Sequence, residues 1–439
     1  MTGPFAMHSR RALLLVAVMA LAVACTGTPR TRDNDIGAIA MPDRYSAAIA
    51  EEILDDGGNA VDAAIAAAFV LAVTYPEAGN IGGGGFLLSR FGEHAAFLDF
   101  REIAPAAATR DMYLDARGEI VDGASLNGHR AVAVPGTVAG LWAAHEKFGT
   151  KSWPELLARA IALAEDGYAI PALLVQRIED DMPRLGGVAS FPRHFGHLRA
   201  DATFRQPDLA ATLRRIAKDG MAGFYEGETA RLIVAEMRRG GGIITADDLA
   251  AYRPRWREPL RSRWRDHEIL AAPPPSSGGF AIVQLLKMKD ALAPSFAGLA
   301  HNSAQYVHLT AEMEKRVFAD RAEYGGDPDF VRQPVEELIA DDYVAARAAE
   351  VDPAAISKTS AVRPGLEGRS TSHFSIVDRD GNAVALTYTL NTDFGSGVVV
   401  EGGGFLLNNE MDDFSAKPGV ANYYGVTGSE ANAIAPGKR

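Results

Sequence analysis

A group of small polar side chains, Ser370-Thr371-Ser372-His373, lies where a well-patterned strand begins in the last fifth of the chain. Cleavage before Thr371 would give this residue a free α-amine, whose reference pKa of about 7.7 to 8.0 lets it accept the hydroxyl proton near neutral pH. The hydroxyl can start that cleavage itself by attacking the Ser370 carbonyl, because the ester that forms is then hydrolysed. Two interpretations stay open from these residues alone: an N-terminal nucleophile made by self-cleavage, or a polar strand edge without catalytic function.

The segment after Thr371 predicts a β-hairpin that would place a second hydroxyl opposite it. The strands "HFSIV" and "AVALTYTLN" are separated by the turn residues "DRDGN". A five-residue loop, 378–382, pairs Thr371 with Thr389, and paired residues have β-carbons about 5 Å apart. The alternation supports this register because it separates an apolar face from a polar one. The apolar face would hold Phe374, Ile376, Val384 and Leu386, and the polar face Thr371, His373, Ser375, Thr387, Thr389 and Asn391.

The elements that must position this hairpin predict a mixed α and β protein. Helical periodicity marks "YSAAIAEEILDD" and "NAVDAAIAAAFVLAVTYP", and strands are expected in "GNIGGGGFLLSRF" and "HAAFLDFRE". The glycine run precedes a strand rather than a helix, and no Gly-Lys-Ser/Thr follows it. We therefore interpret these glycines as places of close backbone approach and not as a nucleotide loop. Residues 134–250 are predicted to be mostly helical, "HEILAAPPPSSGGF" to begin as a strand, and "AIVQLLKMKDAL" and "SAQYVHLTAEMEKRVFADRAEY" to be helices, whereas 352–370 is typical of an exposed loop.

The N-terminus has the pattern of an export signal. Arg10 and Arg11 precede an apolar run from Ala12 to Ala24, which is too short for a permanent membrane span and leads into a polar linker. Cys25, the only cysteine, follows in "LAVAC", which resembles the bacterial lipoprotein processing box and implies cleavage before Cys25 and lipidation of its sulfur. Plain secretion and a buried core helix are the alternatives, and "SRRALL" weakly resembles a twin-arginine signal. The expected location is the periplasm or, through the lipid, a membrane surface.

Composition excludes several classes of function. The chain has 439 residues, of which 47% are hydrophobic and 23% charged, so a folded globular protein is expected. Its formal net charge is −12 without a compensating Lys/Arg run, which argues against a nucleic-acid partner. The pair His194-x-x-His197 alone is a weak metal signal. We therefore expect neither a metal nor another cofactor.

Beyond these patterns, a set of segments occurs along the chain in a specific order. The segments are "GGNAVDAAIAAA", "GGGGFLL", "DFREIAPAAATRDMY", "AVPGTVAGL", "PPPSSGGF", "FADRAEYGGDPDF", "STSHFSIVDRDGNAV", "TYTLNTDFGSG" and "LLNNEMDDFSAKPG". Through them the chain, from about Ala38 to Arg439, resembles the gamma-glutamyltransferase (glutathione hydrolase) family of N-terminal nucleophile hydrolases.

The resemblance implies an α+β fold, a four-layer αββα sandwich, made as one precursor that cleaves itself. Cleavage would fall between Ser370 and Thr371, with Thr371 as nucleophile and Thr389 as the threonine that hydrogen-bonds to it. The implied domains are a signal peptide over 1–24, a large subunit over 25–370 and the N-terminal part of the small subunit over 371–439. The two subunits would form a heterodimer. His373 is expected to be structural, because the family uses the α-amine as base.

Five further positions match the family's substrate-binding residues. Arg101 of "DFRE" would bind the α-carboxylate of the γ-glutamyl group through two charge-assisted hydrogen bonds. Asn391, Glu410 and Asp413 would bind its ammonium group. Tyr424 would close over the substrate, with a one-residue ambiguity because Tyr423 lies beside it. Without the resemblance, Arg101 would be interpreted as a surface ion pair and "NNEMDD" as an acidic turn.

The implied activity is cleavage of the γ-glutamyl amide of glutathione and related compounds, with water or an amine as acceptor. Asp413 favours γ-glutamyl substrates over glutaryl side chains, which have no ammonium group. The family continues beyond the position of Arg439 with a Ser-Ser pair and a Gly-Gly pair that forms the oxyanion hole. We expect a chain that ends there to be unstable or inactive, or else to be a fragment. The alternatives are an acylase of other amide side chains and an inactive, truncated lipoprotein that binds γ-glutamyl compounds.

Overall fold

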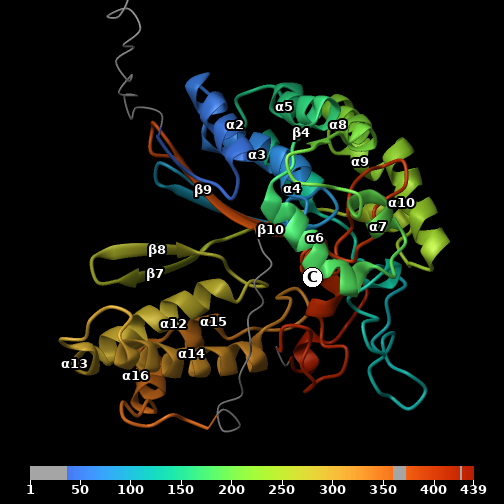
Figure 1. Cartoon of the computed structure of the whole chain (residues 1–439). Coiled ribbons are helices and arrows are strands. Elements are labelled where there is room, and N and C mark those ends of the chain that lie inside the picture. Colours follow the sequence, from blue (N-terminus) through green and yellow to red (C-terminus); the bar gives the residue numbers. More distant parts are fainter. Residues whose placement is uncertain (1–36, 359–371, 426–427) are drawn as a thin grey trace, which may run out of the picture. The chain divides into compact units, whose positions relative to one another are not determined.

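The computed structural model describes residues 37–358, 372–425 and 428–439, which build an antiparallel sheet with helices around it (Figure 1). The sheet has six strands in the order β1-β9-β10-β2-β3-β6, and every neighbouring pair is antiparallel. The hairpin β9–β10 therefore lies inside the sheet, between β1 and β2. The strands are β1 (Gly37–Ala40), β2 (Gly84–Phe91), β3 (His94–Asp99), β6 (Arg255–Arg257), β9 (Ser372–Asp378) and β10 (Ala383–Thr389). The sequence patterns missed β1, a short and mostly exposed edge strand.

The predicted hairpin register is confirmed for the described residues. Phe374 pairs with Leu386 and Val377 with Ala383, which leaves the five residues 378–382 in the loop. The two faces also separate as expected, because Phe374, Ile376, Val384 and Leu386 are all at most 2% exposed. The last described pair is Ser372 with Tyr388. The predicted pairing of Thr371 with Thr389 comes next, and Thr371 lies outside the described residues.

Two helices between β1 and β2 pack against the sheet. Helix α2 (Arg44–Asp55) begins at Asp43, whose side chain accepts a hydrogen bond from the backbone of Ser46. Helix α3 (Ala60–Thr74) begins with a capping box formed by Asn59 and Asp62, and every residue in it is buried. A helix that is apolar on all sides is expected in a core. Helix α3 accordingly packs against α2, α4, α5, β9 and β10.

The remaining elements fall into two groups along the chain. Helices α4 to α11 follow β3, with the short pair β4–β5 among them, whereas β7–β8 and helices α12 to α16 form a second group, gathered below the hairpin in Figure 1. The first group comprises α4 (Thr137–Phe148), α5 (Trp153–Asp166), β4 (Tyr168–Ala169), α6 (Ala172–Leu185), α7 (Ser190–Phe195), β5 (Thr203–Phe204), α8 (Pro207–Asp219), α9 (Ala222–Tyr225), α10 (Gly227–Gly240) and α11 (Ala246–Ala251). The second comprises β7 (Leu260–Trp264), β8 (His267–Ala271), α12 (Gly278–Ala291), α13 (Ala293–Phe296), α14 (Ala304–Tyr324), α15 (Val335–Leu338) and α16 (Asp341–Ala349).

The glycine run before β2 brings backbones into contact, as the sequence predicts. A Cβ atom on Gly83 would clash with the carbonyl oxygen of Thr389, and one on Gly84 would lie 2.5 Å from Oε2 of Glu102. Any side chain at these positions would therefore separate β2 from β10 or displace Glu102.

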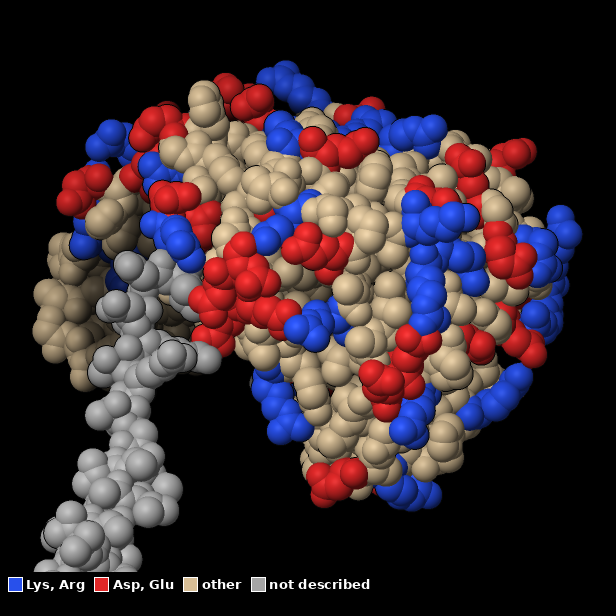
Figure 2. Space-filling view, turned by 90° about the horizontal axis from the view of Figure 1, so that it is seen from above, with Lys and Arg blue, Asp and Glu red and all other residues tan. Residues whose placement is uncertain are grey.

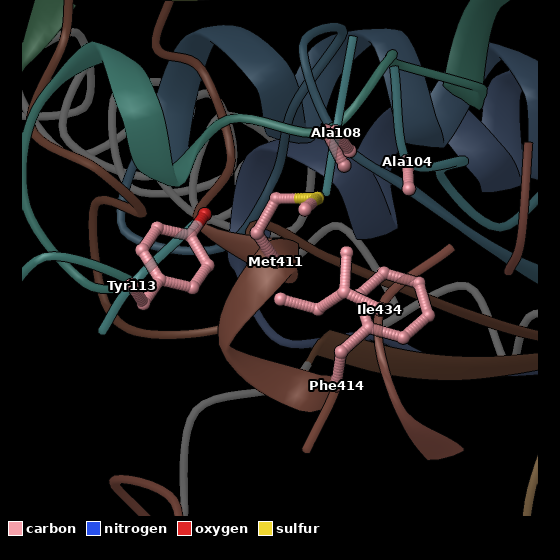
Figure 3. Packing of buried hydrophobic residues seen from close by; sticks show 7 residues of the cluster. Ala104, Ala108, Tyr113, Met411, Phe414 and Ile434 are labelled. Carbon is pink, nitrogen blue, oxygen red and sulfur yellow. The ribbon is translucent and has the colours of Figure 1, made fainter. Parts of the chain in front are cut away.

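An apolar cluster lies beneath the 3₁₀ turn Glu410–Asp413. Met411 and Phe414 from this turn meet Ala104, Ala108 and Tyr113, which come from the segment just after β3 (Figure 3). The cluster is completed by Ala133 and Ile434. Because Glu410 and Asp413 lie in the same turn as Met411, and Arg101 lies three residues before Ala104, this packing helps to hold the three charged residues in place.

The surface of the described residues carries charges of both signs. In the view of Figure 2, basic and acidic side chains lie side by side and neither sign covers the face. None of the helices in the described part of the chain combines the length and apolar character that crossing a bilayer requires. The predicted export signal and Cys25 lie outside the described residues.

Candidate active site

A cavity of about 610 Å³ opens beside strands β2 and β10, and most of the predicted site residues line it. Its volume is within the range of about 300 to 1,000 Å³ that is usual for small-molecule sites. The predicted residues in its lining are Arg101, Thr389, Asn391, Glu410, Asp413 and Tyr424. They come from positions up to 323 residues apart (101 to 424). Ser370, Thr371 and Cys25 lie outside the described residues.

Arg101 follows β3 and is held firmly at both its backbone and its side chain. Its carbonyl oxygen accepts hydrogen bonds from the hydroxyl of Tyr252 at 2.8 Å and from Nη1 of Arg439 at 3.0 Å. Its Nη2 lies 2.8 Å from Oε1 of Glu410 and 2.5 Å from Oδ2 of Asp413. Burial lowers the pKa of this guanidinium, but Glu410 and Asp413 outweigh it and the net shift is upward. Arg101 is thus a permanent cation in contact with two carboxyl groups.

Two carboxyl groups of this cluster are buried and incompletely satisfied. Glu102 is 2% exposed, and burial raises its pKa to about 8 although Arg101 acts in the opposite direction. Burial also raises the pKa of Glu410 well above its ordinary value, with Glu102 adding to the shift. Oε1 of Glu102 and Oε2 of Glu410 have no hydrogen-bond partner among the described residues. We call Arg101, Glu102, Glu410 and Asp413 the acidic wall of the cavity.

Asn391, just after β10, and Tyr424 both line the cavity and are joined by a hydrogen bond. Asn391 has a φ of 81°, a left-handed conformation that asparagine tolerates better than most residues. Its backbone N–H donates to Oγ1 of Thr389 at 2.9 Å, and its carbonyl accepts the hydroxyl of Tyr424 at 2.6 Å. Tyr423 is instead 54% exposed and does not line the cavity. The structure therefore places Tyr424, and not Tyr423, at the site.

His373 lies at the edge of the cavity on strand β9. Its Nδ1 is 2.7 Å from Oγ1 of Thr387, and its Nε2 is 3.3 Å from Oγ of Ser375. Burial lowers its pKa, which favours the neutral ring. Both ring nitrogens are thus engaged by neighbouring hydroxyls, an arrangement that fits a structural histidine.

Several further residues that line the same cavity could not be assigned to it from the sequence. Glu102 is one, although it is adjacent to Arg101 in "DFRE". Ser276, Ser277 and Arg321, from the β8–α12 connection and helix α14, are three more. Their segments, "PPPSSGGF" and "FADRAEYGGDPDF", match family motifs, and this match is the sequence feature that could have indicated a role at the site. We call Ser276, Ser277 and Arg321 the serine wall.

The weak histidine pair lies elsewhere and in an apolar setting. The ring of His194 packs edge-on against Phe195 and Phe204, at 4.7 and 5.8 Å between ring centroids. Burial lowers its pKa to about 4, with His197 acting in the same direction. Within the described part of the chain, no three His, Cys, Asp or Glu side chains gather as metal ligands would.

Comparison with known proteins gives concordant matches. The family model described as gamma-glutamyltranspeptidase matches residues 46–439. A glutathione hydrolase proenzyme of Pseudomonas aeruginosa is 58% identical over 405 residues, which are 92% of this chain and 73% of that protein. The solved gamma-glutamyltranspeptidase from Pseudomonas nitroreducens, complexed with L-DON, has 52% identity and a TM-score of 0.74, with 75% of this chain and 98% of that chain covered.

A cephalosporin acylase from Bacillus halodurans is also structurally similar. It has a TM-score of 0.77 at 28% identity, and the match covers 92% of this chain and 73% of that chain. Together these matches confirm the predicted fold class, an α+β sandwich of the N-terminal nucleophile hydrolase type.

Proposed function

Because the chain belongs to the gamma-glutamyltranspeptidase family, we propose which of its residues cleave and bind the γ-glutamyl amide. Its function is that of a γ-glutamyl hydrolase or transpeptidase acting on glutathione and related compounds. The observation that carries the residue assignment is the cavity itself. Six residues predicted from separate motifs line one cavity, at the end of the hairpin that would present the nucleophile.

Thr371 is the proposed nucleophile, released as a new N-terminus by cleavage after Ser370. The confirmed register supports this, because one more step beyond the Ser372–Tyr388 pair would set position 371 opposite Thr389. The Thr371 hydroxyl would attack the γ-carbonyl carbon while its α-amine accepts the proton and passes it to the leaving amine. Water or an acceptor amine then cleaves the γ-glutamyl ester and restores the hydroxyl. Thr389 would hold the nucleophile by a hydrogen bond.

The acidic wall is the proposed binding site for the two charges of the γ-glutamyl group. Arg101 would bind the α-carboxylate through charge-assisted hydrogen bonds. The α-ammonium would lie against Glu410 and Asp413, which now contact only the guanidinium of Arg101 among cations of the described residues. Asn391 would add an amide oxygen, and Tyr424 would cover the bound group. A zwitterion matches this wall because it supplies one partner for each sign of charge.

We further propose that the chain is an exported precursor of two subunits. Residues 25–370 would form the large subunit and residues from 371 onward the small one, consistent with the name proenzyme in the relatives. Residues 1–24 would be removed as a signal peptide, and a lipid on Cys25 would anchor the protein to a membrane facing the periplasm. Radiolabelled fatty-acid incorporation that is lost in Cys25→Ser would test the anchor.

Expression of the chain, with any coding sequence that follows it, tests the assignment of the nucleophile. We expect two bands on denaturing gels, Thr371 at the new N-terminus, and release of glutamate from glutathione. Thr371→Ala should remain a single band without activity, whereas Ser372→Ala serves as the neighbouring hydroxyl control and should still be cleaved. A new N-terminus at another residue would contradict the assignment, and a stable uncleaved wild-type chain would favour the inactive binding lipoprotein.

A second candidate function, an acylase of other amide side chains, is favoured by the structural match to the cephalosporin acylase. A glutaryl side chain has a carboxylate but no ammonium group, so it would leave Glu410 and Asp413 without a cation from the substrate. We therefore expect γ-glutamyl amides to be cleaved much faster than matched glutaryl amides. The reverse preference would establish the acylase.

A further inference from the structure

The serine wall carries a cation that differs from Arg101 in its surroundings. Arg321 lies in the last turn of α14, and its Nε donates a hydrogen bond to Oγ of Ser277 at 2.9 Å. Its Nη1 is buried and has no hydrogen-bond partner in the part of the chain that the structure describes. Within residues 37–358, 372–425 and 428–439, no ion pair joins this guanidinium to an Asp or Glu side chain, and its Cζ lies 5.9 Å from the ring centroid of Phe318. Arg101 contacts two carboxylates in the same cavity.

The position of Arg321 is defined by the connection that it contacts. Ser277 directly precedes α12, a helix of fourteen residues, and Oγ of Ser276 accepts the backbone N–H of Gly278 at 3.2 Å. A Cβ atom on Gly279 would clash with the carbonyl oxygen of Ala272, so the turn can take this close path only with glycine. The turn thus sets the hydroxyl of Ser277 and the positive end of the α12 dipole beside the guanidinium, and Ser276 lines the same cavity.

This arrangement has an unmet requirement for negative charge. A partly buried guanidinium is normally paired with a carboxylate, because its desolvation is otherwise uncompensated. Its planar N–H groups match a carboxylate in geometry, and serine hydroxyls can donate to the same oxygens. Both Arg101 and Arg321 line the cavity, and only Arg321 lacks a protein carboxylate among the described residues.

We propose that Arg321, with Ser276 and Ser277, binds the carboxylate on the amine side of the γ-glutamyl amide bond. Resting on the proposed function, this carboxylate is the C-terminus of the leaving peptide during attack, or that of an amino-acid or peptide acceptor during transfer. The zwitterion of the γ-glutamyl group uses the charges of the acidic wall. Glutathione has one further charge, the carboxylate of its last residue, and the serine wall offers the matching cation.

Matched donors test the leaving-group part of this proposal. The full chain and Arg321→Gln are compared with glutathione and with glutathione whose terminal carboxylate has been converted to an amide. Charge-assisted hydrogen bonds are strong enough that kcat/KM for glutathione should fall about tenfold more than that for the amide. Arg321→Lys, which keeps the charge without the planar fork, should retain part of the preference for glutathione.

Matched acceptors test the transfer part. With γ-glutamyl-p-nitroanilide as donor, which has no carboxylate on its leaving group, transfer to glycylglycine is compared with transfer to glycylglycine amide. Arg321→Gln should raise the KM for glycylglycine about tenfold more than that for the amide. Arg332→Gln serves as the surface control, because that side chain is 86% exposed and pairs only with Glu337 among the described residues.

The outcomes separate this proposal from the proposed function. Equal losses for the carboxylate and amide forms in both assays would overturn the role of Arg321, while wild-type cleavage of the anilide would leave the function intact. A wild-type chain that cleaves no γ-glutamyl compound would contradict the function instead. Calorimetric binding of glutathione and its amide to wild type and Arg321→Gln would then still decide whether Arg321 recognises the carboxylate.

Discussion

The two walls of the cavity differ in how their charged side chains are paired. In the acidic wall, one guanidinium is surrounded by three carboxyl groups, of which Glu102 and Glu410 are almost completely buried. In the serine wall, one guanidinium meets a hydroxyl and no carboxylate among the described residues. The first wall pairs its guanidinium with protein carboxyl groups, and a bound zwitterion could exchange partners with them. Two of its carboxyl oxygens, Oε1 of Glu102 and Oε2 of Glu410, have no hydrogen-bond partner among the described residues. The second contains Nη1 of Arg321, which has no hydrogen-bond partner among the described residues, and it suits a single anion.

A separate apolar cluster lies behind each wall, which explains how the difference is maintained. Met411 belongs to the cluster that joins the Glu410–Asp413 turn to the segment after Arg101. Met288 belongs to another cluster, between α12, α14 and α16, that carries the serine wall. Because the clusters share no residue, each wall can be perturbed without direct repacking of the other.

Removal of the central cation should show the largest difference between the walls. In Arg101→Gln, the buried carboxyl groups lose their partner, so we expect a loss of about 3 to 5 kcal/mol in the free energy of unfolding. The kcat/KM for γ-glutamyl donors should fall by about a hundredfold or more, since the α-carboxylate loses its charge-assisted partner. Denaturant unfolding and glutamate release measure the two effects.

The matched change in the serine wall is Arg321→Gln. It removes one hydrogen bond to a hydroxyl, a long contact with the ring of Phe318 and, among the described residues, no ion pair. Unfolding should therefore become easier by only about 1 kcal/mol. A loss as large as that of Arg101→Gln would mean that Arg321 has a structural carboxylate partner, and the contrast between the walls would disappear.

The next effect concerns the two apolar clusters. Met411 and Met288 are 0% and 1% exposed, and truncation of either to Ala should destabilise the fold by about 2 to 5 kcal/mol. Their kinetic effects should differ, however. Met411→Ala should raise the KM of every γ-glutamyl donor, the anilide included, whereas Met288→Ala should weaken chiefly the preference for a free carboxylate on the leaving peptide. Parallel KM changes in the two variants would show that the walls are coupled.

Local structure could be predicted from the sequence, whereas the tertiary contacts of the site residues could not. Alternation of apolar and polar residues in 372–389 defines the register of the hairpin, and the long apolar pattern of α3 indicates a buried helix. Both predictions depend only on local sequence. Arg101 and Glu410 were found because their motifs match a family. The restraints on Arg101 could not be found, because Arg439 and Tyr252 reach its carbonyl from 338 and 151 residues away. Burial of Glu102 is equally a product of tertiary packing.

The pH dependence of the free energy of unfolding should show a smaller effect, which comes from Glu102 in the acidic wall. Its folded pKa of about 8 lies above the ordinary carboxyl value, so the folded state keeps a proton that the unfolded chain has lost. This contribution to stability is complete below the unfolded pKa of about 4.3 and is lost as the pH rises towards 8. The side chain in Glu102→Gln stays neutral at every pH. The free energy of unfolding should therefore fall less steeply over this pH range than in wild type, by up to about 1 kcal/mol per pH unit.

Thermal or denaturant unfolding at several pH values measures this slope. Glu93→Gln is the control, because its side chain is 95% exposed and should leave the slope unchanged. A slope that is the same in wild type and Glu102→Gln would mean that Glu102 is ionised in the folded protein. The acidic wall would then carry more negative charge than one guanidinium and one substrate ammonium can balance.

The smallest expected effect distinguishes the two adjacent tyrosines at the edge of the acidic wall. Tyr424→Phe removes the hydroxyl that donates to the carbonyl of Asn391, and loss of one such bond costs about 1 kcal/mol. If Tyr424 also covers the γ-glutamyl group, the KM of the donor should rise about fivefold while that of glycylglycine changes less. Tyr423→Phe changes an exposed side chain and should alter neither value. Equal effects of the two substitutions would show that the hydroxyl of Tyr424 does not hold Asn391 in place. The acidic wall would then differ from the serine wall in its charges but would have no hydrogen-bonded tyrosine at its edge.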